Sequence, residues 1–465
     1  MIPLSTLREK HPQFIYEKYD WNISSKGLEI IFNFRLLPDI KFQPKILIEN
    51  ASLAQIEKIG KETLDNLVFN LGLAEMISYW KTACSPEIMI NAGALDAEQK
   101  KWWQWLIING LGQFFYENKI NFNGPGFLKI TSTKPTGLKF SNLKISEKIL
   151  VPMGGGKDSA ATLEILKRTE KDLTCFALNP TKNTEEIIRT AGCENPVFAR
   201  RQIDPKLIEL NQKGYFNGHT PFSAYLAFLT TLTAALFDCR YIAVSNEASS
   251  NEATLKYLDK NINHQWSKTF SFEKSFKKYS QKYLAKQIEY FSFLRPLYEI
   301  QIARIFANFE KYHPIFISCN EAYKTYSGTK TPTGTWCANC SKCLFAFIIL
   351  YPFIDKKEII KIFGQNLFEN KNLLETTKEL IGEKPIKPLE CIGTRQESNI
   401  SFYLSLVKAR QESPSGDLPF LLDYFEKNIL PKKKNWPKEA EKILNSWNRQ
   451  NSLPKGFNKI LKPYL

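Results

Sequence analysis

The middle of the chain alternates short apolar runs with amphipathic segments. Continuous apolar runs predict buried strands at residues 148–153, 173–178, 241–245 and 314–318, with a shorter strand at 196–199. Between them, apolar residues recur at helical spacing in residues 159–169, 184–191, 221–237 and 297–309. Strands that are apolar on both faces and alternate with helices are typical of a parallel sheet covered on both sides. The pattern therefore predicts the α/β class.

The segments on either side have a different pattern. Residues 27–35 and 45–49 have strand character, and residues 57–80 and 96–120 predict amphipathic helices. The second of these helices carries an aromatic stripe that predicts a buried face, formed by Trp102, Trp103, Trp105, Phe114, Phe115 and Tyr116. Beyond about residue 365 the chain becomes polar and helical. We therefore expect an N-terminal α+β domain (1–145), a parallel-sheet domain (146–365) and a helical C-terminal region (366–465).

Composition narrows the class of protein. With 43% hydrophobic and 24% charged residues, the chain is expected to fold rather than to be disordered. Its net charge of +16 favours anionic partners such as phosphates, but general lysine richness explains the excess equally well, so charge alone does not indicate nucleic-acid binding. The N-terminus lacks a signal-peptide pattern, and the longest apolar helical runs fall short of the roughly 18 residues that span a bilayer. We expect a cytoplasmic protein without a membrane partner.

The strongest functional signal follows the first buried strand. It consists of Gly154, Gly155, Gly156, Lys157, Asp158 and Ser159. Three glycines allow successive backbone amides to surround an anion, and the next helix adds its positive N-terminal end. Ser159 is placed to donate to a phosphate oxygen and Lys157 to add a charge, whereas Asp158 suits capping or Mg²⁺ binding. Because Lys157 precedes Asp158 and the glycine spacing differs, this is not a Walker A loop.

The glycine loop resembles the S-G-G-x-D-S motif of the PP-loop ATP pyrophosphatases, with Gly154 in place of the first serine. This resemblance implies a HUP-like nucleotide-binding domain that cleaves ATP between its α and β phosphates. It also implies that AMP is transferred to a carboxylate or carbonyl oxygen while the loop holds the pyrophosphate. Asn179, at the end of the second strand, would then line the adenosine side. The glycine removes one hydroxyl contact and leaves the backbone amides in place.

Further segments between about residues 13 and 410 resemble a single family of peptidoglycan precursor enzymes. These segments are 79–81, 102–110, 217–221, 245–249, 263–268, 294–297, 336–345 and 387–393. Together they resemble the MurL family of epimerases. The resemblance implies an ATP- and Mg²⁺-dependent inversion of the terminal L-glutamate of UDP-MurNAc-L-Ala-L-Glu, releasing AMP and diphosphate. It also implies functional coupling to the ligase that forms the muramyl dipeptide.

Proton transfer at the glutamate α-carbon needs groups near the strand ends. Glu247 directly follows a predicted buried strand, and Glu252 lies five residues later. Burial would raise the pKa of either carboxyl into a useful range. For Glu247, Mg²⁺ coordination or loop capping is an equally good interpretation.

Two histidines and two cations are further candidates. His219 and His264 lie in polar segments of the family resemblance and are candidate acid–base groups, with a structural role as the alternative. Lys268 and Arg295 are candidates for binding the phosphates or carboxylates of the substrate, with ordinary surface charges as the alternative.

A cysteine cluster suggests metal binding. Cys337, Cys340 and Cys343 are spaced by two residues, and Cys319 ends the preceding predicted strand. Four thiolates fit a closed tetrahedral structural zinc site. The sequence order, with one cysteine followed later by three closely spaced cysteines, is similar to that of the zinc site in 7-cyano-7-deazaguanine synthase, another PP-loop enzyme. Buried free thiols, or one thiol acting as an acid or base, are the alternatives. The remaining cysteines are expected to be core or incidental: Cys84, Cys175, Cys193, Cys239 and Cys391.

Two other functions compete with the epimerase. A PP-loop enzyme that adenylates a nucleobase or tRNA would also explain the loop, the cysteines and the basic charge, but no RNA-binding module is recognisable in the sequence. A non-catalytic nucleotide sensor would use the same loop, although the intact Asp158 and Ser159 favour catalysis.

Overall fold

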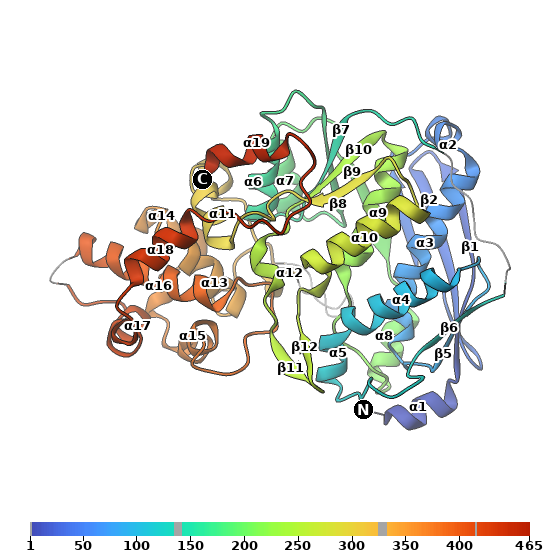
Figure 1. The fold of residues 1–465 in the computed structure, drawn as a ribbon, viewed down its shortest axis with the longest axis horizontal. Coiled ribbons are helices and arrows are strands. Elements are labelled where there is room, and N and C mark those ends of the chain that lie inside the picture. The colour runs from blue at the N-terminus through green and yellow to red at the C-terminus, as the bar shows by residue number, and fades with distance from the viewer. Residues whose placement is uncertain (1, 134–141, 324–332, 414–415) are drawn as a thin grey trace.

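One eleven-stranded sheet forms the centre of the computed structural model, which describes residues 2–133, 142–323, 333–413 and 416–465 (Figure 1). Its strands, in chain order, are β1 (Gln13–Ser24), β2 (Gly27–Leu36), β3 (Ile40–Phe42), β4 (Lys45–Glu49), β5 (Glu87–Ile90), β6 (Lys129–Ser132), β7 (Lys148–Pro152), β8 (Leu173–Leu178), β9 (Val197–Gln202), β10 (Cys239–Val244) and β13 (Glu289–Ser292). A separate hairpin is formed by β11 (Leu255–Tyr257) and β12 (Lys260–Ile262).

The parallel part of the sheet has the spatial order β13-β10-β7-β8-β9, and all neighbouring pairs in it are parallel. Its strands are buried on both faces, so alternate residues enter two different cores. Leu150 and Ile242 contribute to one core, and Val151 and Ala243 to the other. The predicted α/β class with a largely parallel sheet is confirmed.

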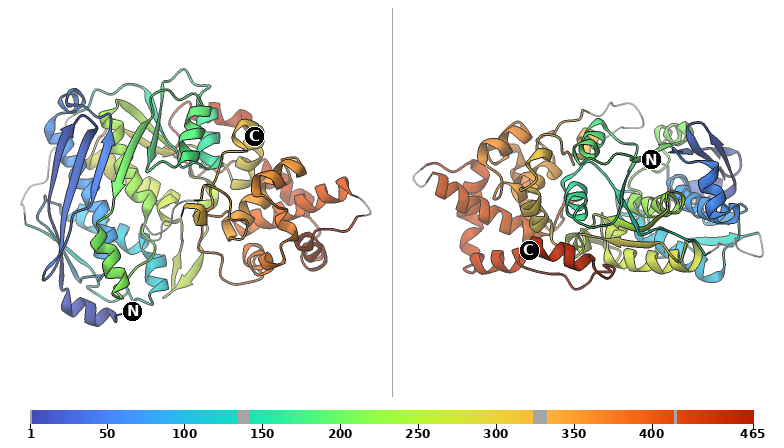
Figure 2. Two further views of the ribbon diagram at one scale, coloured as in Figure 1. Left: turned by 180° about the vertical axis from the view of Figure 1, so that it is seen from behind. Right: turned by 90° about the horizontal axis from the view of Figure 1, so that it is seen from above.

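The N-terminal strands continue the same sheet. β4 pairs antiparallel with β9, and β2 and β1 follow antiparallel, whereas β5 and β6 are parallel additions beyond β1. Along the second half of β1, half-buried and exposed residues alternate, as expected for a strand with one solvent-facing side. Figure 2 shows these strands from the side that helices leave uncovered. The predicted N-terminal and parallel-sheet domains therefore share one sheet.

Helices pack on both faces of the sheet, and on one face they also cover the N-terminal strands. One face carries α3 (Lys61–Trp80), α4 (Ala97–Gly110), α9 (Phe222–Leu236) and α10 (Phe270–Tyr283). The other carries α6 (Lys157–Leu166), α7 (Lys182–Thr190), α11 (Glu299–Phe306) and α19 (Phe457–Leu461). The predicted aromatic stripe is confirmed as core for Trp103, Phe114 and Phe115, which are fully buried. Its other members, Trp102, Trp105 and Tyr116, are half-buried and pack against the same core.

The predicted C-terminal region, residues 366–465, is helical and joins the second core. The helices that lie to one side of the sheet (Figure 1) begin before it, with α13 (Ser341–Leu350) and α14 (Lys356–Phe363), and continue with α15 (Leu374–Ile381), α16 (Arg395–Glu412), α17 (Phe420–Asn428) and α18 (Trp436–Leu444). Shorter helices are α1 (Leu4–Lys10), α2 (Leu53–Ile59), α5 (Gly112–Glu117), α8 (Pro205–Gln212) and α12 (Asn320–Tyr323). Across the described ranges, none of the helices combines the length and apolar character needed to cross a bilayer.

Three predicted elements differ from the structure. Residues 314–318 form no strand: β13 occupies the sheet edge beside β10, and the segment is bound to the glycine loop by a backbone hydrogen bond from Ile317 N–H to the Gly155 carbonyl at 2.9 Å. The helix predicted at 57–80 is two helices, because Gly60 adopts φ +83 between α2 and α3. The helix predicted at 96–120 is also divided, at Leu111, into α4 and α5.

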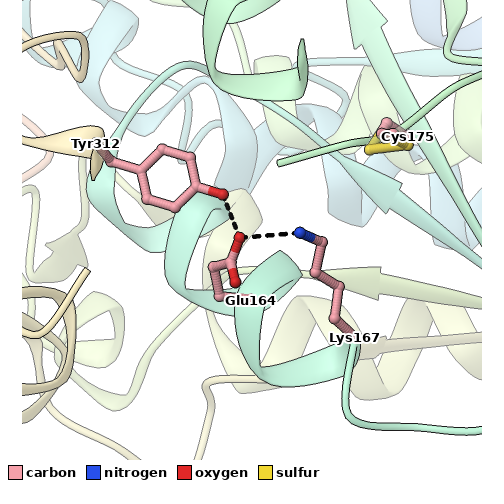
Figure 3. Close-up of a disulfide and its surroundings, with 5 residues drawn as sticks. Glu164, Lys167, Cys175 and Tyr312 are labelled. Atoms are coloured by element: carbon pink, nitrogen blue, oxygen red, sulfur yellow. Dashed lines mark hydrogen bonds and ion pairs between the residues drawn. A yellow bond between two sulfur atoms is a disulfide. The ribbon is translucent and has the colours of Figure 1, made fainter. Parts of the chain in front are cut away.

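Two cysteines expected to be incidental form a pair. Cys175 on β8 and Cys193, which follows α7, are joined as a disulfide (Figure 3). The disulfide links β8 to the turn before β9.

Figure 3 also shows Glu164 on α6, which accepts a hydrogen bond from Tyr312 and pairs with Lys167 at 3.1 Å. The Tyr312 contact fixes α6 against the segment that leads to residues 314–318.

Candidate active site

The glycine loop lies where the strand order reverses. Counted from β7, the five parallel strands have the order 3-2-1-4-5, so the chain leaves β7 and β10 in opposite directions along the sheet. Ligands of open α/β sheets bind beyond the carboxyl ends of the strands at such a point. The loops that follow β7 and β10 contain the glycine loop and Glu247, respectively. The fold therefore brings together two of the predicted site segments.

Glycines set the backbone conformation of the loop. Gly155 adopts φ +81, a left-handed conformation that favours glycine, and Gly156 is the N-cap residue of α6. The Ser159 hydroxyl is held in the loop, where it donates to the Gly156 carbonyl at 3.1 Å and accepts from Gly154 N–H at 3.4 Å. A β-carbon on Gly154 would meet open space, so the family's serine would fit at this position.

Three carboxyl groups meet beside the loop. Oxygens of Asp158, Glu247 and Glu299 lie within 4.8 Å of one another, and the buried ammonium of Lys157 pairs with both Asp158 and Glu299. Lys157 is therefore engaged by acidic groups of the protein. Glu299 is the first residue of α11 and was not among the residues predicted to form the site.

The carboxyl cluster has the features of a divalent cation site. Glu247 is 2% exposed, and its Oε1 atom has no hydrogen-bond partner. Burial, together with the negative charge of Glu299, raises the pKa of Glu247 to about 8. An orphaned buried carboxylate oxygen beside two further carboxylates matches the all-oxygen ligand sets that Mg²⁺ prefers. The residues present thus fit the predicted ion, with Glu299 as an additional candidate ligand.

Arg295 has a different environment from the one expected of a substrate-binding cation. It is fully buried, and its guanidinium pairs with Glu273 at 3.1 Å. It also donates to the Glu247 carbonyl, the Ser250 hydroxyl, the Lys268 carbonyl and the Ser292 hydroxyl. The guanidinium nitrogens of Arg295 donate to acceptors of the protein itself. This geometry therefore favours a role in fixing the backbone of Glu247 and Lys268 over direct contact with the substrate.

Replacing Arg295 with methionine is expected to lower the free energy of unfolding by about 3–5 kcal/mol, because the change leaves the buried Glu273 charge uncompensated. Urea unfolding of the full chain measures the effect. The matched control is Arg200→Met, since Arg200 is 44% exposed and pairs with Glu49 at the surface; this change should cost about 1 kcal/mol or less. Equal effects for the two variants would contradict the positioning role.

The two predicted histidines lie together, with ring centroids 4.9 Å apart. Burial, the neighbouring His264 and the charge of Lys81 lower the pKa of His219 well below its usual value. His264 Nδ1 lies 2.5 Å from Gln113 Oε1. Burial raises the pKa of the Cys391 thiol, but the charge of Lys268 and the neighbouring His264 lower it to about 5. Cys391, expected to be core or incidental, is therefore a neighbour of this polar group.

Lys268 connects the histidine group with the carboxyl cluster. Its ammonium interacts electrostatically with Cys391, Glu247, Asp158 and Glu299. This placement is compatible with the predicted role in substrate binding, because a cation in the crevice can hold a carboxylate or phosphate.

Two other candidates lie at the margin of the site. Asn179 sits at the carboxyl end of β8, but its side-chain amide is engaged by the backbone of Arg201, with Oδ1 accepting at 2.8 Å and Nδ2 donating at 3.1 Å. Glu252 pairs with Lys387 at 3.0 Å and accepts from Arg395 N–H, so it fixes the C-terminal region and is not a member of the carboxyl cluster.

The four predicted cysteine ligands converge. Sγ–Sγ distances are 3.9 Å for Cys319–Cys340, 3.5 Å for Cys337–Cys343 and 3.5 Å for Cys340–Cys343. Thiolates bound at about 2.3 Å to a tetrahedral zinc lie about 3.8 Å apart. All four sulfur atoms lie within 4.8 Å of one another, which is close enough for one metal ion to bind them together.

Comparisons with known proteins identify the family of the chain. A family model described as the MurL N-terminal domain matches residues 5–293, and one described as the MurL C-terminal domain matches residues 315–427. The chain belongs to the MurL family. It is 32% identical to a UDP-N-acetyl-alpha-D-muramoyl-L-alanyl-L-glutamate epimerase from Xanthomonas oryzae over 76% of this chain and 77% of the relative. It is 31% identical to one of the same name from Salinispora tropica, over 84% of each chain.

Each of the two matched MurL domains contains a different part of the site. The N-terminal match contains the glycine loop, Glu247 and both histidines, whereas the C-terminal match contains the four clustered cysteines and Cys391. Sequence reasoning missed Glu299, Gln113 and Cys391 as site residues. Glu299 closely follows the family-like segment 294–297 and Cys391 lies within 387–393, so the segments carried a signal, but nothing local indicated which side chains face the crevice.

Proposed function

We propose that this protein inverts the terminal glutamate of UDP-MurNAc-L-Ala-L-Glu from the L to the D configuration, as an isomerase of peptidoglycan precursor synthesis. The observation that carries the proposal is the similarity, over most of the chain, to relatives that are named as epimerases of this dipeptide. Within the described residues, the similarity is supported by a glycine loop and a carboxyl cluster that lie together at the carboxyl ends of the parallel strands.

We further propose that ATP is a co-substrate and that the central domain is of the PP-loop, HUP-like type. Support comes from the 3-2-1-4-5 strand order and from the glycine loop at the N-terminus of α6. In this proposal the loop amides and Ser159 hold the departing pyrophosphate, and the glutamate α-carboxylate attacks the α phosphorus of ATP. The products of this step are an acyl-adenylate and pyrophosphate.

Adenylation solves the chemical problem of inversion. The α-proton beside a carboxylate is hard to remove, because the resulting carbanion would be a dianion. In the acyl-adenylate that negative charge is masked and the carbonyl is electron-poor, so a protein base can remove the proton. Return of a proton to the opposite face inverts the centre, and hydrolysis of the acyl-adenylate then releases AMP and the D-epimer.

The carboxyl cluster is the proposed Mg²⁺ site, with Asp158, Glu247 and Glu299 as its ligands. When bound, the ion would neutralise charge on the phosphates of ATP. Lys157 keeps Asp158 and Glu299 together by pairing with both. Lys268 is the proposed cation for a carboxylate or phosphate of the muramyl substrate.

The four clustered cysteines are the proposed structural zinc site. Cys319 follows the segment whose Ile317 binds the Gly155 carbonyl, and Cys340 is the N-cap residue of α13. A zinc ion bound here would fix both elements beside the glycine loop. We also propose that the protein works in the cytoplasm, where ATP and nucleotide-linked precursors are available, and that a ligase forming the muramyl dipeptide supplies its substrate.

Solvent exchange tests the proposed function. Incubation with UDP-MurNAc-L-Ala-L-Glu, ATP and Mg²⁺ in D₂O should give the D-glutamyl epimer with deuterium at the α-carbon, together with AMP. The matched control replaces the terminal L-glutamate by L-isoglutamine, the α-amide of glutamate, which keeps the γ-carboxylate but offers no α-carboxylate to adenylate. If the authentic dipeptide shows no inversion and gains no deuterium at the α-carbon, the proposal is refuted. AMP formation that is stimulated instead by tRNA or a deazapurine acid would establish the competing function.

A further inference from the structure

Glu397, in the C-terminal region, carries a fully buried carboxyl group. It is the third residue of α16, which packs beside α11 (Figure 1). Its Oε2 atom accepts from the backbone N–H and from the hydroxyl of Thr394, at 2.7 and 2.8 Å, and Thr394 Oγ1 accepts from Glu397 N–H at 3.1 Å. This reciprocal pair caps the start of α16 and uses one of the two carboxylate oxygens.

The other oxygen of Glu397 binds groups outside α16. Oε1 accepts from the Ser249 hydroxyl at 2.9 Å and from Ile300 N–H at 3.2 Å. Because a backbone N–H can only donate, the 3.1 Å contact of Glu299 N–H with Ser249 Oγ leaves the Ser249 hydrogen for Glu397. The direction of the bonds is therefore fixed, from Glu299 N–H to Ser249 and from the Ser249 hydroxyl to Glu397.

These bonds join the two segments that carry Glu247 and Glu299. Ser249 lies two residues after Glu247. The backbone N–H groups that donate to Ser249 and Glu397 belong to the first turn of α11, which begins at Glu299. Such N–H groups have no partner within their own helix, so Ser249 and Glu397 supply the acceptors that the start of α11 needs. Loss of the Ser249–Glu397 contact would therefore change how the two carboxyl-bearing segments lie relative to each other.

The burial of Glu397 exceeds what a helix cap requires. A carboxyl group in the third helical position caps a helix equally well at an exposed surface. Burial of a carboxylate is costly unless hydrogen bonds compensate, and here four donated bonds do so, two of them from outside α16. The placement therefore indicates a role in the contact with Ser249 and α11.

We propose that Glu397 is a positioning residue of the carboxyl cluster, and that through Ser249 it sets the separation of Glu247 and Glu299; this inference rests on the cation site of the proposed function. Glu397 is not itself a ligand in this proposal. It acts on the two ligand-bearing segments, so the C-terminal region completes a site whose three carboxyl groups all come from the predicted parallel-sheet domain.

Mn²⁺ binding to the free protein measures this role without turnover. Mn²⁺ serves as a paramagnetic probe of the Mg²⁺ site, and electron paramagnetic resonance quantifies the free ion during a titration. Binding that is lost in Glu299→Gln defines the cluster site. Ser249→Ala and Glu397→Gln should each raise the Kd of this site by about 10–100-fold, the usual effect of removing an outer partner of metal ligands.

The two variants break the contact at different points. Ser249→Ala removes the bridging hydroxyl and leaves the Thr394 cap of α16 in place. Glu397→Gln replaces one acceptor oxygen by a donor group, so one of the two pairs of bonds loses its acceptor. The matched control is Ser398→Ala, because Ser398 is also a buried serine and donates to the Thr394 carbonyl within α16. Its Kd for Mn²⁺ should equal that of the wild type.

Steady-state kinetics separate positioning from general damage to the fold. In the epimerisation assay, Ser249→Ala should need about 10–100-fold more Mg²⁺ for half-maximal rate and should approach the wild-type kcat when Mg²⁺ is saturating. A variant that is merely destabilised would have a lower melting temperature and a lower kcat, while its Mg²⁺ requirement stayed unchanged.

An unchanged Kd for Mn²⁺ in Ser249→Ala overturns the proposal. A Glu397→Gln protein that loses melting temperature but binds Mn²⁺ as the wild type does also overturns it, because Glu397 would then be a helix cap alone. If Glu299→Gln removes no Mn²⁺ binding, the cation site itself is refuted, and this inference with it. The proposed function is judged separately, since inversion and α-deuterium incorporation by the wild type would still establish the epimerase.

Discussion

Replacing Asp158 with asparagine is expected to lower AMP formation and epimerisation together, each by about 10²–10³-fold. The change removes one charge from the carboxyl cluster and breaks one of the two ion pairs of Lys157. If the cluster holds Mg²⁺ against the phosphates of ATP, adenylation fails, and every later step fails with it. Ser159→Ala should reduce both activities in the same proportion, because the Ser159 hydroxyl is held inside the glycine loop.

The matched control for Asp158→Asn is Asp172→Asn. Asp172 is exposed and directly precedes β8 at the amino end of the sheet, away from the crevice. Quantification of AMP and of the D-epimer in the same reaction should show both near the wild-type level for this control. An Asp158→Asn enzyme that forms AMP normally and fails only in inversion would contradict the assignment of Asp158 to the adenylation step.

Cys340→Ala should lose the bound metal and about 4 kcal/mol or more of stability, since loss of a structural metal is among the few single changes with effects this large. Cys340 contacts both Cys319 and Cys343, so its removal opens the tetrahedral set. Elemental analysis of the purified wild type should give one zinc per chain. Urea unfolding, which is expected to be cooperative only with zinc bound, measures the stability.

Cys239→Ala provides the control, because Cys239 is a buried thiol outside the cysteine cluster. This variant should keep its zinc and lose no more than about 2 kcal/mol. A wild-type protein free of zinc, with equal unfolding midpoints for both variants, would show that the four thiols are not a metal site.

The sequence predicted the parts of the fold that local pattern determines. β7, β8 and β10 are continuous apolar runs because both of their faces are buried, and such runs stand out along the chain. The same signal failed at residues 314–318, where a short apolar run is buried in an irregular segment against the glycine loop. Periodicity cannot separate a short buried strand from buried coil, because both lack an alternating polar side.

Only those parts of the candidate site that belong to recognisable sequence motifs could be predicted. The glycine loop and Glu247 follow apolar strands, so their place at the carboxyl edge could be inferred. The pairing of Lys157 with Glu299 joins residues 142 positions apart, and the contact of His264 with Gln113 joins residues 151 positions apart. Cys391 comes from the C-terminal region, which sequence reasoning treated as separate from the site. Such contacts are set by tertiary packing, which no local pattern encodes.

Transfer of an oxygen isotope from substrate to nucleotide tests the central claim most directly. The muramyl dipeptide is labelled with ¹⁸O in the α-carboxylate of its terminal glutamate, and the nucleotide product is examined by mass spectrometry. If the carboxylate attacks the α phosphorus and water later cleaves the acyl bond, the released AMP carries one ¹⁸O atom. Epimerisation accompanied by ADP and orthophosphate, or by unlabelled AMP, would contradict the account.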